Sequence, residues 1–527
     1  MSPLLILGIG IVVVIGLIIV LRVNAFIALI TAAMIVSLLA PGEFADKISR
    51  VAVAFGGTVG KIGIVIALAA VIGKCLMDSG AADRIVRAFL STLGEKNASM
   101  ALMGSGFVLS IPVFFDTVFY LLVPLARSLH KRTQKNYMLY LMAICAGGCI
   151  THTLVPPTPG PLLIAAAFKI DLGLMMLMGA IVAFPTALVA LGVCKLINRW
   201  VNIPMRDYSG EPEPEPLTDA QLPPLLLSLL PVLLPVILIS ANSIAKVFAN
   251  AETIDLLAQR LVSTQVSADV NEAKPLASDL VNAKALSHAE DAVPLAALLE
   301  EERVVVPEMA QTLAQQLVTA KALSFAESTP RPAQQTANVT AVLGSPNLAL
   351  FFSAIIAMAL LVWKRKIPLK KLSESVDNAL MSGGVIILIT AGGGAFGAML
   401  QAAGIEEIIQ PGEHAGLMVF LAAFAAASML KFAQGSSTVA MTTTAVTFAA
   451  MGITTEMLGC HHVYLALTIG AGSLFGSWMN DSGFWIISRM GVLTEAEALK
   501  SWTPLLASLG AVAFAFTLLL SRLFPLL

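Results

Sequence analysis

Long apolar runs separated by short polar segments extend along almost the whole chain. A helix that crosses a membrane needs about 20 mostly apolar residues. The pattern predicts spanning helices over 4–21, 25–40, 62–77, 172–197, 222–239, 348–363, 385–400, 417–430 and 505–520. The first run has neither a basic segment before it nor a cleavage site of small residues after it. We therefore expect it to remain as an uncleaved span rather than to act as a signal peptide.

Composition supports a membrane protein and excludes several other classes. Hydrophobic residues make up 57% of the 527 residues and charged residues only 12%, and the mean hydropathy is +0.86. Soluble domains contain about 25% charged residues, so the chain cannot cover a water-facing surface of ordinary composition. The net charge of −1 gives no basic field for nucleic acid. Five scattered cysteines without a C-x-x-C pair argue against a disulfide framework and against a metal site.

Basic residues predict the orientation of the chain in the membrane. Lys and Arg accumulate in cytoplasmic loops, and here they cluster at 127–135, 195–206 and 364–371. The segment 241–345 lies between spans that leave one cluster and lead into the next, so we expect it on the periplasmic side. It carries 7 basic and 12 acidic residues and is rich in Ala, Gln and Leu, which favours a soluble helical insertion. A ligand-binding role, a helical cap or partner surface, and a passive insertion all stay open for it.

The two halves of the chain resemble each other at an offset of 324 residues. Gly73 then falls on Gly397 and Gly148 on Gly472, and the same offset superposes the polar stretches that interrupt the helices. Two repeats with breaks at matching places are typical of secondary transporters, in which the repeats have inverted topology. The predicted divisions are N-terminal scaffold spans (1–57), a first transport repeat (58–170), scaffold spans (171–240), the insertion (241–345), a scaffold span with a basic loop (346–381), a second transport repeat (382–494) and a C-terminal span (495–527).

Four breaks interrupt the apolar runs, at 110–119, 151–161, 431–438 and 480–484. The first predicts a re-entrant hairpin that enters from the cytoplasm with Pro112 near its tip. The second contains four prolines and a glycine in seven residues, which excludes a continuous helix. The third predicts the tip of a second hairpin. Unwound backbone at membrane depth is tolerated only when it is buried in protein or lines a cavity, so the four breaks predict one central site.

The residues at these breaks suit a small anion that carries hydroxyl groups. Helix N-termini and free amides attract carboxylates, and neutral hydroxyls and amides bind hydroxyl groups. The predicted substrate-binding residues are Pro112, Thr117, Thr158, Gly160, Gln434, Gly435, Ser436, Ser437, Thr438, Asn480 and Ser482.

Three titratable residues at the breaks are candidates for proton coupling. Asp116 and Asp481 are intramembrane carboxylates, which are costly unless they are paired or functional. His152 is the third candidate, because histidine titrates near neutral pH. The alternatives are helix caps or ion pairs with Lys74 or Lys431 for the two aspartates, and a structural role for the histidine.

The sequence at the breaks resembles the gluconate permease family of gluconate:proton symporters. The matching strings are IPVFFDTVFYLLVPLA, HTLVPPTPGP, AQGSSTVAMTT and NDSGFW, together with GGGAFG at 392–397. The resemblance runs from about residue 5 to the C-terminus, without the insertion. It implies proton-coupled uptake of gluconate or a related sugar acid across a bacterial inner membrane by two inverted repeats, each with a re-entrant hairpin and a broken helix. It also implies a homodimer, and it leaves open other hydroxy-carboxylates or a hydroxy amino acid as the substrate.

The sequence therefore predicts an all-α polytopic membrane protein that acts as a secondary transporter without a cofactor. A sodium-coupled carboxylate symporter on the same fold is the nearest alternative, because hydroxyls and carbonyls at such tips also coordinate sodium. An anion channel is the alternative from another class, although no charged ring or filter-like repeat is present. The chain has neither an HExxH nor a GxSxG motif, so we do not expect an enzyme.

Overall fold

The computed structural model describes residues 2–21, 23–134, 136–201, 203–206, 217–266, 332–404, 416–479 and 481–526. Within these ranges every regular element is a helix. The chain divides into two compact units, one made of Met1–Ile237 and Pro346–Leu527 and the other of Leu238–Ser345. Most of the predicted insertion, including the segment 267–331, lies outside the described residues.

Eight helical segments of the described chain are long and apolar enough to cross a membrane. They are Asp46–Ser79, Tyr137–Ala167, Leu172–Trp200, Leu225–Lys246, Pro346–Arg365, Leu369–Ala402, Gly416–Gln434 and Glu495–Leu523. The chain is therefore an all-helical, multi-pass membrane protein.

The two N-terminal runs, predicted as full spans, form helices with nearly the predicted bounds. The first forms helix α1 (Pro3–Ile15) and then a π-helical turn (Gly16–Val20), and the second forms α2 (Ala25–Leu39). At about 1.5 Å per residue, the 15 residues of α2 fall short of a hydrocarbon core about 30 Å thick. The helical stretches 3–20 and 25–39 nearly coincide with the predicted runs 4–21 and 25–40, so the apolar pattern located their ends correctly.

Matching helices in the two halves begin 323 residues apart, one fewer than the sequence offset. These pairs are α3 (Asp46–Ser79) with α16 (Leu369–Ala402), α8 (Pro159–Ala167) with α21 (Ser482–Met490), and α9 (Leu172–Trp200) with α22 (Glu495–Leu523). The members of each pair have the same length, namely 34, 9 and 29 residues. Both halves therefore repeat one plan, as the offset in the sequence predicted.

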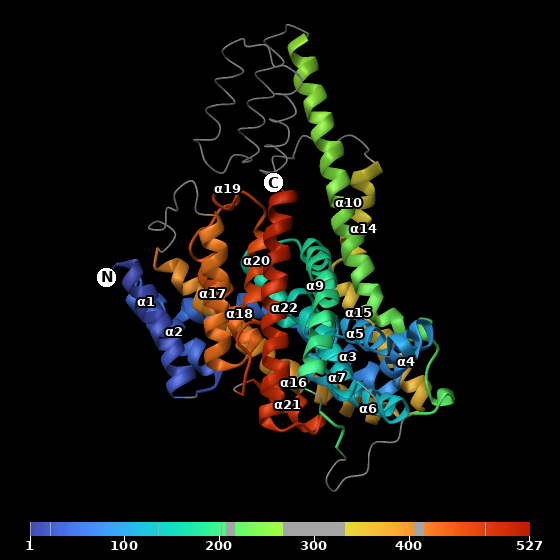
Figure 1. The fold of residues 1–527 in the computed structure, drawn as a ribbon. Coiled ribbons are helices and arrows are strands. Elements are labelled where there is room, and N and C mark those ends of the chain that lie inside the picture. Colours follow the sequence, from blue (N-terminus) through green and yellow to red (C-terminus); the bar gives the residue numbers. More distant parts are fainter. Residues whose placement is uncertain are drawn as a thin grey trace. The chain divides into compact units, whose positions relative to one another are not determined.

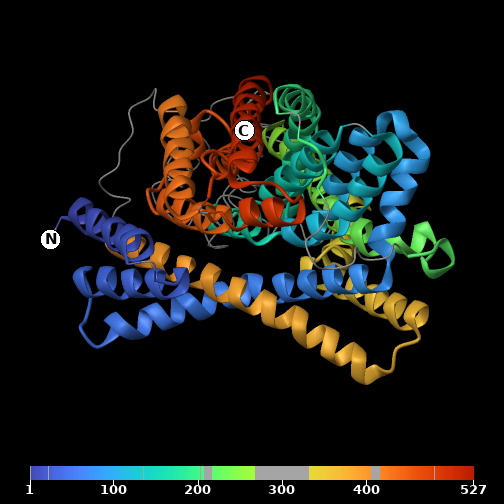
Figure 2. The same ribbon diagram turned by 60° about the horizontal axis from the view of Figure 1, so that its bottom comes forward.

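Four helices form one layer along one side of the first unit. The two long helices α3 and α16 pack side by side and run in opposite directions (Figure 2). Helix α2 packs on α16, and α15 (Pro346–Arg365) packs on α3. Because each repeat supplies a shorter helix that packs on the long helix of the other, the layer has the crossed arrangement expected of inverted repeats.

Further helices of each repeat form a hairpin and a broken helix. The hairpins are α5 (Ala98–Leu109) with α6 (Phe115–Thr133), and α17 (Gly416–Gln434) with α18 (Ser437–Ala449) (Figure 1). The broken helices are α7 (Tyr137–Leu154) with α8, and α20 (His462–Gly472) with α21. The break before α21 covers 473–481, so it begins earlier than the predicted 480–484.

The two repeats interlock at their breaks. The second helix of each hairpin packs against the second half of the other repeat's broken helix, α6 on α21 and α18 on α8. This exchange brings the start of α6, the start of α18 and the start of α21 to one region of the molecule.

The other elements lie outside this region. Helix α4 (Ala81–Leu93) is amphipathic, and α19 (Thr455–Leu458), η2 (Glu95–Asn97) and η3 (Asp219–Gln221) are single turns. Helix α10 (Leu225–Val266) passes from the first unit into the second, which also contains α14 (Pro332–Leu343). Within the second unit Ala245, Ala249 and Ala337 are buried together.

Candidate functional site

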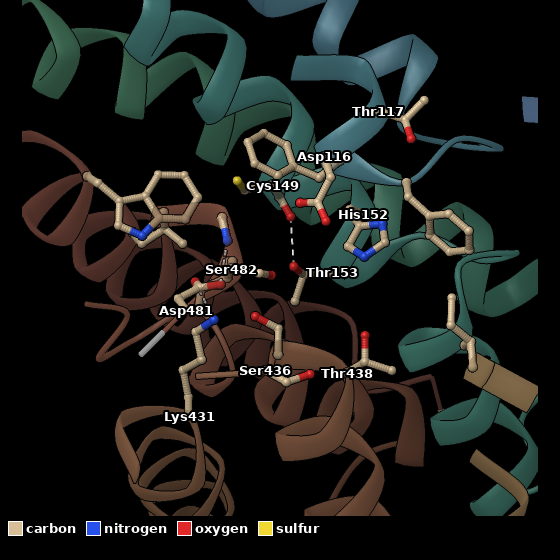
Figure 3. A pocket seen from close by; sticks show the side chains of 18 of the residues that line it. Asp116, Thr117, Cys149, His152, Thr153, Lys431, Ser436, Thr438, Asp481 and Ser482 are labelled. Carbon is tan, nitrogen blue, oxygen red and sulfur yellow. Dashed lines mark hydrogen bonds and ion pairs between the residues drawn. The ribbon is translucent and has the colours of Figure 1, made fainter. Parts of the chain in front are cut away.

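A cavity of about 420 Å³ lies where the hairpin turns and the helix breaks meet. Its walls come from the start of α6, the last turn of α7, the turn between α17 and α18, the start of α21, and parts of α16 and α22 (Figure 3). Pockets for small molecules range from about 300 to 1,000 Å³, so the cavity has room for a small organic anion with some water.

The cavity receives three helix N-termini. Asp116 lies in the first turn of α6. Ser436 caps α18, and its hydroxyl accepts a hydrogen bond from the Val439 N–H at 3.3 Å. Asp481 caps α21, and its Oδ1 accepts from the Gly483 N–H at 2.9 Å. Unpaired amides and the helix dipole make such ends favourable for anions.

Asp481 forms a buried ion pair with Lys431. Lys431 Nζ lies 2.7 Å from Asp481 Oδ2, and the two side chains are only 2% and 10% exposed. The Ser477 hydroxyl donates to the same carboxylate oxygen, and Trp502 Nε1 donates to Ser477 Oγ at 2.7 Å. Lys431 also donates to the Gly435 carbonyl at 2.5 Å. The ion-pair alternative for Asp481 is therefore confirmed, and its carboxylate is already satisfied by three donors, counting the helix cap.

Asp116 and His152 have a different environment. Asp116 is half-buried and lines the cavity, and no described residue makes a hydrogen bond or an ion pair with its carboxylate. His152 packs edge-on against Phe114 with ring centroids 6.0 Å apart. Its buried Nδ1 likewise has no partner in the described part of the chain. Lys74, the other candidate counter-charge, pairs with Asp78 at 2.8 Å, away from the cavity lining.

The structure brings eight of the fourteen predicted site residues to the cavity. They are Asp116, Thr117, His152, Ser436, Ser437, Thr438, Asp481 and Ser482. Five others are absent from its lining: Pro112, Thr158, Gly160, Gln434 and Gly435. Asn480 lies outside the described residues.

The five that do not line the cavity lie in the turns and helix ends around it. The Thr158 hydroxyl donates to the Val155 carbonyl at 2.7 Å and closes the turn before α8. A side chain at Gly160 would place its Cβ 2.1 Å from the Met441 Cε, so glycine permits the contact between α8 and α18. Gly435 has φ = +87°, which turns its carbonyl toward Lys431. Pro112 is buried in the hairpin turn, and Gln434 lies at the end of α17.

Several lining residues could not be identified as site residues from the sequence. Ser382 and Ile386 lie on α16, and Trp502 and Leu506 lie on α22, within long apolar helices that have no break. The sequence showed Lys431 as a charge in an apolar helix and a candidate counter-charge for the aspartates, but not as a residue that lines the site. That lone charge was the one available signal for it, and its position beside the third break made it informative.

Sequence comparison supports the same class of protein. The chain matches the profile of the family described as "GntP family permease" over residues 2–270 and 270–523. It is 29% identical to an "Uncharacterized permease" of Haemophilus influenzae over 92% of this chain and 84% of that protein. It is 28% identical to the "Gluconate permease" of Pseudomonas aeruginosa over 97% of this chain and 96% of that protein. For the "High-affinity gluconate transporter" of Escherichia coli the identity is 24%, over 98% and 99% of the two chains.

Among solved structures, the Alcanivorax borkumensis YdaH transporter aligns over 95% of this chain and 98% of its own, with a TM-score of 0.48 and 11% identity. The assignment to a family rests on the profile match, which covers nearly all of the sequence. With eight candidate spans among its described residues and a cavity at the meeting point of its two repeats, the chain belongs to the GntP family of permeases.

Proposed function

We propose that this permease imports gluconate or a related sugar acid together with a proton across a bacterial inner membrane, with the segment 241–345 on the periplasmic side. The observation that carries the proposal is the composition of the cavity. Its lining combines one lysine, two aspartates and a series of neutral hydroxyls beside three helix N-termini. A sugar acid presents a matching set of groups, one carboxylate and several hydroxyls.

The hydroxyl donors have the positions that a polyhydroxylated chain needs. Ser436, Thr438 and Ser482 line the cavity near the starts of α18 and α21 (Figure 3). Thr117 contributes a hydroxyl from the first turn of α6. A serine or threonine hydroxyl can donate a hydrogen bond to a substrate hydroxyl or accept one from it, because every hydroxyl group both donates and accepts.

The charges in the cavity favour a co-transported cation. With Lys431, Asp116 and Asp481 all ionised, the three charges sum to −1. An anionic substrate would add a second negative charge to a poorly solvated site, which is unfavourable. One proton taken up with the substrate offsets that charge. Asp116 is the group best placed to accept it, because Asp481 is held by Lys431 and Asp116 has no partner among the described residues.

The location of the cavity fits alternating access. Helix α16, which we assign to the scaffold together with α2, α3 and α15, contributes Ser382 and Ile386, while the hairpins and broken helices contribute the charged groups. Movement of the hairpin-bearing part against the scaffold would carry the substrate across. A homodimer, in which the scaffold is held in place by its copy, stays a prediction.

Transport in proteoliposomes tests this function. We expect uptake of radiolabelled gluconate to require an imposed proton gradient and to be abolished by a protonophore. Asp116→Asn should lose gradient-driven accumulation and keep exchange of gluconate for gluconate. Asp78→Asn is the matched control, because Asp78 is paired on α3 away from the cavity lining, and it should retain accumulation.

Other outcomes separate the alternatives. Accumulation driven by a sodium gradient alone would replace the coupling ion on the same fold. Uptake that equilibrates and never exceeds the external concentration would indicate a channel. If no gluconate enters under either gradient, the substrate is wrong, and a panel of other hydroxy-carboxylates would show which one is transported.

A further inference from the structure

We propose that the Lys431 ammonium is the anchor for the carboxylate of the transported anion, and that Asp481 and Ser477 are positioning residues that hold this ammonium in place. The inference rests on the proposed function in one respect, that the substrate is an anion. It goes further by assigning the anchoring contact to one side chain and by separating the roles of the two aspartates.

Lys431 is the one lysine or arginine among the described residues that line the cavity. A lysine ammonium has three N–H donors. The structure gives two of them to the Gly435 carbonyl and Asp481 Oδ2, and no described residue takes the third. A donor left without a protein partner on a side chain only 2% exposed is unfavourable unless water or a ligand accepts it.

A chain of hydrogen bonds fixes the position of the Lys431 ammonium. Trp502 Nε1 donates to Ser477 Oγ, and the Ser477 hydroxyl donates to Asp481 Oδ2, which pairs with Lys431. The Asp481 carboxylate is also held by the Gly483 N–H at the start of α21. Each group in the chain has its partner set by another, so the ammonium cannot rotate freely between alternative acceptors.

The surroundings of Lys431 give the bound anion a direction. In Figure 3, Lys431, Asp481 and Ser482 lie together on one side of the cavity, and Ser436 and Thr438 lie beyond them. A carboxylate at Lys431 would also be close to the start of α21, whose dipole favours negative charge. The hydroxyl-bearing part of the molecule would then extend past Ser436 toward Thr438. Asp116 and His152 lie across the cavity from Ser436, where a proton on Asp116 can offset the added charge.

Binding of a charged and an uncharged form of one molecule tests the assignment. Calorimetry on the purified, detergent-solubilised full chain would compare gluconate with gluconamide, in which a neutral amide replaces the carboxylate. The variant is Lys431→Gln combined with Asp481→Asn, because removing only one charge would leave the other buried and unpaired. The matched control is Lys74→Gln with Asp78→Asn, which removes the i, i+4 pair on α3.

We expect the wild type and the control to bind gluconate more tightly than gluconamide. In the Lys431 double variant this preference should fall by about 10-fold or more, the loss expected for a hydrogen bond to a charged group. The single variant Lys431→Arg should keep part of the preference that the double variant loses, since arginine carries the same charge with a different shape. Ser477→Ala should weaken gluconate binding and leave gluconamide binding unchanged, whereas a purely structural role would weaken both equally.

The outcomes distinguish this inference from the proposed function. A double variant that is monodisperse and keeps the wild-type preference overturns the inference, whatever the transport assay shows. A wild type that binds both compounds equally also overturns it. A wild type that prefers the carboxylate through Lys431 and yet fails to transport gluconate refutes the proposed function and leaves the anchor standing.

Discussion

Replacement of Gly147 by alanine tests how closely helices α5 and α7 must pack. Gly147 lies on α7, two residues before the cavity residue Cys149, at the point where α7 packs on α5. An added Cβ would lie 2.0 Å from the carbonyl oxygen of Met103 and 2.9 Å from the backbone nitrogen of Phe107. Both of these atoms belong to the backbone, so no change of side-chain rotamer can relieve the clash.

The size of the effect follows from these distances. The closest ordinary contacts between carbon and a carbonyl oxygen are about 3.3 Å. The two helices must therefore separate by roughly 1 Å, which opens gaps along the rest of their interface. Overpacking of this kind costs about 1–3 kcal/mol, and we expect the upper part of that range because neither backbone can turn aside.

Gly192→Ala provides the matched control. Gly192 lies within α9, and a Cβ there meets nothing within 4 Å. Alanine at that position should be neutral or stabilising by up to about 1 kcal/mol, since glycine is the poorer helix former. Thermal unfolding of both purified variants in the same detergent is the assay, and we expect Gly147→Ala to unfold at a clearly lower temperature. Equal unfolding temperatures for the two variants would refute the packing argument.

Two further predictions concern charged groups away from the cavity lining. Glu497 accepts two hydrogen bonds from Arg206, both at 2.7 Å, and because the pair is partly exposed, Glu497→Gln should cost only about 1 kcal/mol in thermal unfolding. Exchange of the two residues should recover part of that loss, and no recovery would mean that the pair contributes little. Burial raises the pKa of Asp83 on α4 above its usual value. Ionised Asp83 therefore destabilises the fold, and this penalty is absent below the ordinary pKa, grows between the ordinary and the raised pKa, and is complete above the raised pKa. Asp83→Asn should therefore raise the unfolding temperature at pH 7 and leave it unchanged at about pH 3, and an equal effect at both pH values would contradict the burial argument.

The helix breaks were predictable because their causes are local. Prolines at 156, 157, 159 and 161 exclude a continuous helix, and α7 ends at Leu154 as that pattern predicts. Ser436 and Asp481 cap helices through hydrogen bonds to amides two or three residues away. Such contacts depend only on neighbouring residues, so the sequence contains the information to place them.

Tertiary packing, in contrast, decided which of the predicted site residues line the cavity. Ser436, Thr438 and Ser482 line the cavity as expected, whereas Thr158 and Gln434, which have the same kind of polar side chain at the same kind of break, do not. The Thr158 hydroxyl bonds to the backbone of its own turn. Which of several hydroxyls at a break faces the cavity depends on the rotation of the helix that follows, and packing sets that rotation.

By itself, the sequence determined that this is a helical membrane protein with two repeats, where its helices break, and that polar and charged groups gather at the breaks. Local composition and hydrogen bonds between near neighbours are sufficient for those conclusions. Only the tertiary structure decided that Lys431 pairs with Asp481, 50 residues later, while Asp116 is left unpaired among the described residues, and that Ser382 and Trp502 from unbroken helices complete the wall. These relations arise because α6 packs on α21 and α18 on α8, contacts between distant segments that no local pattern encodes.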